Sequence, residues 1–296
     1  MKNFKLKLFF LSVLFLPLQT FAFQIIKAPD VPMMNDFILS PAKINIEMNS
    51  GEEKEEYVYV ENRGGEPSEF EISFEDLEYS GDPVSPVKIK NSLNKNISLS
   101  KFLSVEKKKF ILEHGEKAIF PIFVKIPALT ENGGLQSSIL VSGKKISQNA
   151  EGKNAKIIAR LGSSIFVKIK NSKLIEKGKF SSFEFKENKF LVGFENEGNI
   201  HLNPYGIIEV KDIFGRIKNR IGISSWSVLP GSAFVREINL GDGDSFFFRK
   251  ALATVYPGYG NEGNIETKSV WIYPNLFEVS FYLLSVLFLI WLLVRM

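Results

Sequence analysis

The sequence predicts an all-β protein: two tandem immunoglobulin-like β-sandwich domains, with an N-terminal signal peptide and one C-terminal transmembrane helix. Three observations lead there. Short runs of alternating apolar and polar residues recur along the middle of the 296-residue chain, separated by turn residues. No sustained 3.6-residue apolar period interrupts them. Long apolar runs lie only at the two ends. Two series of about seven short strands without helices fit two β-sandwiches.

The N-terminal 22 residues have the three parts of a secretory signal peptide. Lys2, Lys5 and Lys7 form a basic region, Leu8–Leu18 is apolar, and small residues precede a cleavage site after Ala22. An uncleaved N-terminal helix is the alternative. Residues 23–36 contain two prolines and no clear period, and are expected to form a linker or a first edge segment.

Residues 37–170 are predicted to form the first sandwich. Ile44, Ile46 and Met48 alternate with polar residues, as residues on one face of a strand do. Further runs follow, at Tyr57–Val60, Phe70–Phe74, Lys109–Leu112 and Lys117–Ile126, and a hairpin is expected from Ser137–Ser142 and Ala155–Lys170. The acidic cluster Glu52–Glu56 is interpreted as a solvated turn or edge, with a cation site as the alternative.

Residues 171–274 are predicted to form the second sandwich. Its expected strands lie near Phe180–Phe185, Lys189–Phe194, Gly206–Lys211, Arg216–Ile221, Ala233–Asn239, Ser245–Tyr256 and Ile265–Ile272. Asp212–Gly215 and Val228–Ser232 have the composition of turns between strands. The segment Val60-Glu61-Asn62-Arg63-Gly64 is similar to Phe194-Glu195-Asn196-Glu197-Gly198, which agrees with two domains of related plan.

Residues 275–296 are predicted to be a membrane anchor and a short tail. Leu276–Val294 is almost wholly apolar, and as a helix it would cover about 28 Å, close to the ~30 Å hydrocarbon core of a bilayer. Trp271 and Tyr273 lie just before it, where aromatic rings favour the membrane interface. The expected localisation is therefore the cell membrane, single-pass, with the bulk of the chain extracytoplasmic. A buried core helix is the alternative.

Charge and cysteine content exclude several classes of protein. The net charge is +4, and three of these charges are signal-peptide lysines, so the mature chain is near +1 (4 − 3). A nucleic-acid-binding protein would instead show a basic stripe, so no nucleic-acid partner is expected. The absence of cysteine excludes disulfides, thiolate catalysis and cysteine-ligated zinc.

No catalytic, cofactor or metal site is predicted. The two histidines, His114 and His201, lie in turn sequences without a nucleophile motif, and are expected to be solvated. Gly241–Ser245 has oxygen ligands at calcium-loop spacing but lacks the acids of an EF-hand, so a hairpin turn is favoured. The glycines of Tyr256–Asn264 do not open a helix and are no phosphate loop. A non-enzymatic protein is expected; an enzyme using scattered carboxylates is a further alternative.

Several segments resemble WxL-interacting cell-surface proteins of bacteria. The similar segments are Ser40–Ile44, Gly51-Glu52 and Tyr57–Asn62 in the first region, and Glu197–Leu202, Gly206–Gly215 and Val228–Ser232 in the second. The resemblance implies two immunoglobulin-like domains and one C-terminal transmembrane helix. It also implies peptidoglycan as a partner of the first domain and host surface components as partners of the second. No binding residue of the family maps onto a matching position. The chain also departs from the family in ending two residues after its apolar run.

The predicted function is that of a membrane-anchored, non-enzymatic surface protein that binds cell-wall polymer or another surface protein, as in adhesion. Its expected partners are that polymer or protein, and the lipid bilayer through the C-terminal helix. The alternative is a periplasmic or surface chaperone-like assembly factor that works by strand donation or acceptance. The ligand-binding residues and the oligomeric state are not predicted.

Overall fold

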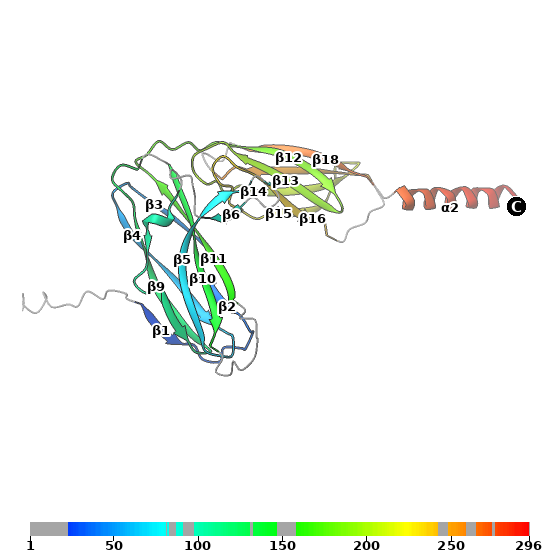
Figure 1. Ribbon diagram of the computed structural model, residues 1–296. Helices are drawn as coiled ribbons and strands as arrows, with labels where there is room; N and C mark the ends of the chain where they lie inside the picture. Colours follow the sequence, from blue (N-terminus) through cyan, green and yellow to red (C-terminus); the bar gives the residue numbers. More distant parts are fainter. Residues whose placement is uncertain are drawn as a thin grey trace, which may run out of the picture.

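The computed structural model describes residues 23–80, 82, 87–90, 98–130, 133–146, 158–241, 248–258, 265–273 and 276–295. These residues form two β-sandwiches that meet at an angle, and a C-terminal helix that extends from the second (Figure 1). The prediction of an all-β fold made of β-sandwiches is confirmed. The predicted signal peptide, most of Gly241–Ser245 and most of the Tyr256–Asn264 segment lie outside the described residues.

The first sandwich consists of two β-sheets, with five and six strands. One has the order β1-β9-β4-β2, with β7 also paired to β9, and the other has the order β3-β11-β10-β5-β6, with β8 also paired to β5. The strands are β1 (Gln24–Lys27), β2 (Phe37–Ser40), β3 (Lys43–Met48), β4 (Glu53–Asn62), β5 (Ser68–Tyr79), β6 (Val87–Lys90), β7 (Leu103–Ser104), β8 (Lys109–Leu112), β9 (Glu116–Lys125), β10 (Gly134–Lys145) and β11 (Ile158–Ile169). A 3₁₀ turn, η1 (Ser100–Phe102), precedes β7.

The alternating residues noted in the sequence build the first core. Ile44, Ile46 and Met48 of β3 all point inward and are buried, while the residues between them are exposed. A group of phenylalanines fills the centre, with Phe70 and Phe110 stacked at 5.8 Å between ring centroids. The acidic cluster lies on an exposed stretch at the start of β4, as expected, where Glu53 forms an ion pair with Lys125 of β9.

The second sandwich repeats the two-sheet plan with fewer strands. One sheet has the order β12-β13-β16 and the other β15-β14-β17-β18. The strands are β12 (Gly178–Lys186), β13 (Lys189–Asn196), β14 (Tyr205–Asp212), β15 (Ile217–Ile223), β16 (Ala233–Asn239), β17 (Arg249–Tyr256) and β18 (Glu266–Ile272). Its core is separate from the first and contains Phe190, Phe194 and Trp226.

The five-residue similarity between the two halves corresponds to the same local structure. Asn62 and Asn196 are each buried at the end of a strand. The side-chain amide of Asn62 donates to the carbonyls of Glu66 and Leu112, and its Oδ1 accepts from Gly64 N–H. Asn196 donates in the same way to Ile200 and Val228, and accepts from Gly198 N–H. In both sandwiches one buried asparagine therefore satisfies the polar backbone of the turn.

The C-terminal apolar run forms helix α2 (Leu276–Arg295), whose described apolar side chains are exposed. Of the residues that the structure describes, no helix combines the length and the apolar character needed to cross a membrane. The predicted transmembrane anchor and the single-pass membrane localisation are therefore wrong.

Candidate functional site

One edge of the first sandwich is left open at strand β11. β11 pairs with β10 from Ile158 to Lys168, but on its other side β3 pairs with it only from Ser164 onward, in parallel register with Lys43. Among the described residues, no strand pairs with Ile158–Gly162 on that side, and all five residues are exposed. We call Ile158–Gly162 the free edge.

The hydrogen bonds of β11 show which backbone groups the free edge presents. Ser164 donates its N–H to Ala42, on the β3 side, whereas Ile169 donates to Gly133, on the β10 side. Backbone direction alternates along a strand, so the N–H and C=O groups of Ile158, Arg160 and Gly162 point outward. Unpaired groups in such a row are a template for pairing with another strand.

Apolar side chains accompany these polar groups. Leu161 has the same parity as Ile165 and Val167, which are fully buried in the core, yet Leu161 is 39% exposed. Ile158, at the start of the strand, is 60% exposed. Along the free edge, Leu161 of the core-facing row is thus partly exposed, and Ile158 is exposed on the opposite face of the strand.

The other end of β11 reaches the joint between the two sandwiches. Phe166 forms a small buried cluster with Leu77 of β5 and Leu229 of the second sandwich. The Lys43 ammonium lies 5.3 Å from the centroid of the Phe166 ring and donates to Ser227 Oγ at 2.5 Å and to Asn203 Oδ1. Burial lowers the pKa of Lys43. Lys43 of the first sandwich therefore forms hydrogen bonds with two side chains of the second, those of Asn203 and Ser227.

The two sandwiches approach each other closely at this joint because a glycine, Gly134, lies at the contact. A Cβ placed on Gly134, the first residue of β10, would lie 2.8 Å from Ile200 Cα and 2.9 Å from the Asn199 carbonyl oxygen. Both of those atoms are backbone of the second sandwich. A side chain at position 134 would therefore push the two sandwiches apart.

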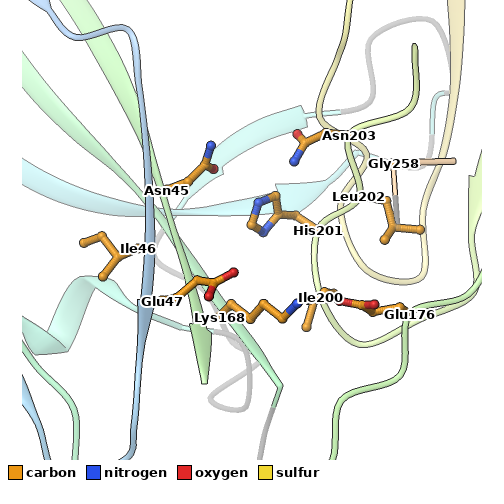
Figure 2. Close-up of a pocket in the computed structure, with 10 residues that line it drawn as sticks. All are labelled: Asn45, Ile46, Glu47, Lys168, Glu176, Ile200, His201, Leu202, Asn203 and Gly258. Carbon is orange, nitrogen blue, oxygen red and sulfur yellow. Dashed lines mark hydrogen bonds and ion pairs between the residues drawn. The ribbon is translucent and has the colours of Figure 1, made fainter. Parts of the chain in front are cut away.

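A small pocket lies in the joint, with a volume of about 200 Å³. Figure 2 shows that Asn45, Glu47 and Lys168 reach it from the first sandwich, and that His201 projects from the second toward these strands. Lys168 Nζ and Glu176 Oε1 form an ion pair at 2.5 Å. The imidazole of His201 stacks on Phe166, with ring centroids 4.3 Å apart.

The electrostatics of the joint disfavour a charged histidine. Burial first, and then the charges of Lys43 and Lys168, lower the pKa of His201 to about 4. His201 is therefore not the solvated turn residue predicted from its sequence neighbours. His114 is also partly buried: its Nε2 lies 3.0 Å from the Val31 carbonyl and its Nδ1 accepts from Gly65 N–H.

The two residues predicted at a membrane interface lie at the end of β18. Trp271 is 48% exposed, with Lys250 Nζ 5.7 Å from its ring centroid, and Tyr273 is 70% exposed beside Phe248. Neither contacts the joint or the free edge. Sequence reasoning missed Lys43, Phe166 and Lys168, because each reads as an ordinary strand residue. No described group of three or more acidic or histidine side chains has metal-binding geometry.

Replacement of Lys43 by methionine is expected to loosen the joint without unfolding either core. Methionine keeps much of the side-chain length but donates no hydrogen bond, so about 1–2 kcal/mol of coupling is lost. We expect several-fold faster protease cleavage in the connecting segment between Asn171 and Lys177, measured by gel densitometry. Lys145→Met, on the exposed end of β10, is the matched control. Equal cleavage rates in the two variants would contradict the role of Lys43.

Neither a protein-family model nor a curated protein matches the chain. Solved structures do. The class 5 fimbriae chaperone CfaA is 15% identical with a TM-score of 0.41, covering 81% of this chain and 100% of that one. The YadV chaperone is 10% identical with a TM-score of 0.42, covering 80% and 99%. The SafA pilin–SafB chaperone complex of Salmonella enterica matches at 12% identity and 0.41, covering 79% and 96%. With TM-scores below 0.5, we base no functional argument on these likenesses.

The function first predicted from the sequence needs correction. A membrane-anchored protein that binds cell-wall polymer requires a spanning helix, and no helix in the described part of the chain meets that requirement. The prediction of a membrane-anchored protein that binds cell-wall polymer is therefore wrong. The resemblance to WxL-interacting proteins stays a prediction.

Proposed function

We propose that this protein is a non-enzymatic assembly factor that binds a client protein by pairing one of the client's strands with the free edge of β11. The free edge carries this proposal. It combines outward backbone donors and acceptors at Ile158, Arg160 and Gly162 with the uncovered apolar side chains of Ile158 and Leu161. Strand addition to a sheet edge uses the first for affinity and the second for specificity.

The surrounding structure sets the length and the limit of the client strand. β3 occupies the edge from Ser164 onward, so an added strand ends there. The five residues of the free edge match the usual length of a strand. At the far end of β11, Phe166 packs against Leu229 of the second sandwich, so the same strand contacts both the client and the joint.

The client is sought among the proteins encoded next to this gene, each expressed together with the full chain. A photo-crosslinking amino acid is placed at Ile158, and at exposed Glu184 of β12 as the control position. We expect a covalent adduct from position 158 and none from position 184. Adducts of equal yield at both positions, or none at 158 with every neighbouring product, would contradict the proposal.

Arg160→Pro is expected to weaken client binding at least roughly tenfold, because proline removes an outward N–H and distorts the strand needed for pairing. Proline is tolerated on an edge, and the N–H removed does not bond to β10. Arg160→Ala is the matched control: it also removes the ion pair with Glu75 but keeps the N–H, so binding changes by roughly twofold or less. Binding is measured without crosslinking, by co-purification of each variant with the client that the crosslinking experiment identifies.

Hydrogen exchange gives an independent readout. Client binding should slow exchange at the amides of Ile158, Arg160 and Gly162, while Ala159 and Leu161, already paired with β10, change little. Uniform protection across β11, or protection on another strand, would contradict pairing at the free edge.

A further inference from the structure

The contact between His201 and Phe166 joins the two sandwiches through one titratable ring. His201 lies in the segment between β13 and β14, and Phe166 lies on β11. Phe166 is only 2% exposed, because Leu77 and Leu229 pack around it. The stacked rings, 4.3 Å between centroids and 28° apart, are therefore part of the closed joint.

The charged groups around His201 come from both sandwiches. Lys43 of β3 and Lys168 of β11 are the cations that face it. Glu47 of β3 and Glu176, before β12, line the same pocket, but each has its own cation: Lys170 for Glu47 at 3.5 Å, and Lys168 for Glu176 at 2.5 Å. Lys43 already occupies the cation position over the Phe166 ring, so the ring offers little compensation to an imidazolium.

These surroundings determine the sign of the pH effect. Burial and the two lysines lower the pKa of His201 to about 4 when the joint is closed, whereas an exposed histidine titrates near 6.5. The closed joint therefore binds the proton more weakly than the open one. Its full stability is present above about pH 6.5 and is lost as the pH falls toward 4.

We propose that the joint between the sandwiches is acid-sensitive: neutral His201, stacked on Phe166, keeps it closed, and protonation of His201 opens it. The difference between the pKa values of 6.5 and about 4 limits the effect to a roughly 300-fold shift of the closed–open equilibrium, reached in full only between pH values well above 6.5 and well below 4. The inference does not depend on a client binding at the free edge.

The distance between the sandwiches is the direct test. The natural chain has no cysteine, so spin labels on Glu106→Cys and Glu184→Cys of the full chain report one distance between the two sandwiches. We expect a narrow distance distribution at pH 7.5 that becomes broad at pH 4.5 and narrows again on return to pH 7.5.

Variants at the two histidines separate the joint from general acid effects. His201→Phe keeps a stacking ring that cannot take up a proton, so its distribution should stay narrow at both pH values. His201→Arg carries a fixed charge and should be broad already at pH 7.5, where acid unfolding of the sandwiches plays no part. His114→Gln is the matched control and should behave as the natural chain does.

Two results would overturn the proposal. One is a His201→Phe chain that broadens at pH 4.5 as the natural chain does. The other is a His201→Arg chain that stays narrow at pH 7.5 with unchanged far-ultraviolet circular dichroism. A parallel NMR titration of the two imidazoles checks that the transition follows the protonation of His201 and not that of His114.

Discussion

Replacing Asn196 by alanine is expected to lower the free energy of unfolding of the second sandwich by about 3 kcal/mol. The change leaves the Ile200 carbonyl and the N–H of Gly198 without their partner in a buried turn, while the Val228 carbonyl keeps its bond from Leu202 N–H. Each buried polar group left unpaired costs about 1–3 kcal/mol, with part of this recovered by water. All three tryptophans lie in the second half of the chain, and Trp226 is buried there, so fluorescence during urea unfolding reports this sandwich.

Two further variants identify the cause. Asn196→Asp keeps the side-chain shape and the acceptor but loses both donors, so at neutral pH it should be at least as destabilising as alanine. Asn219→Ala removes a single long hydrogen bond of 3.4 Å and should cost less than about 1 kcal/mol. The equivalent Asn62→Ala should destabilise the first sandwich, followed by circular dichroism. Equal stability of the Asn196→Ala and Asn219→Ala chains would refute this role of the asparagine.

Gly134→Ala is expected to force the joint apart while both cores stay folded. The added Cβ would meet backbone atoms of Ile200 and Asn199 at distances below 3.0 Å, and backbone cannot yield as a flexible side chain does. We expect the labelled chain to show a longer and broader distance between the sandwiches at pH 7.5, with little change in circular dichroism.

Gly222→Ala is the matched control for this variant, because a Cβ on that strand glycine meets nothing within 4 Å. Its distance distribution should equal that of the natural chain. A Gly134→Ala chain with an unchanged distance would show that the joint already tolerates a wider separation. In that case the close approach at Gly134 does not set the angle between the sandwiches.

Much of the secondary structure follows from local patterns. The burial of alternate residues in β3 is readable because one face of a strand repeats every two residues. The turn residues Asp212–Gly215 predicted a break between the strands Gly206–Lys211 and Arg216–Ile221. The structure has strands at Tyr205–Asp212 and Ile217–Ile223. The asparagine-glycine similarity was visible in sequence, but its hydrogen bonds reach carbonyls as far as 50 residues away.

The apolar C-terminal run shows where a local pattern misleads. Its composition predicts a helix, and α2 forms over Leu276–Arg295. Among the described residues, however, no helix is long and apolar enough to cross a membrane. The predicted membrane localisation depended on that one step, and it is wrong as a result.

The sequence by itself determined the all-β class, the positions of most strands and turns, and the exclusion of every cysteine-based site. These properties depend on residue identity and on spacing within a few residues. The tertiary structure alone decided that β3 covers β11 only from Ser164, which leaves the free edge, and that His201 meets Phe166 across the joint. Both arise from pairing between residues more than 30 positions apart, and in such pairings neither residue's local sequence specifies its partner.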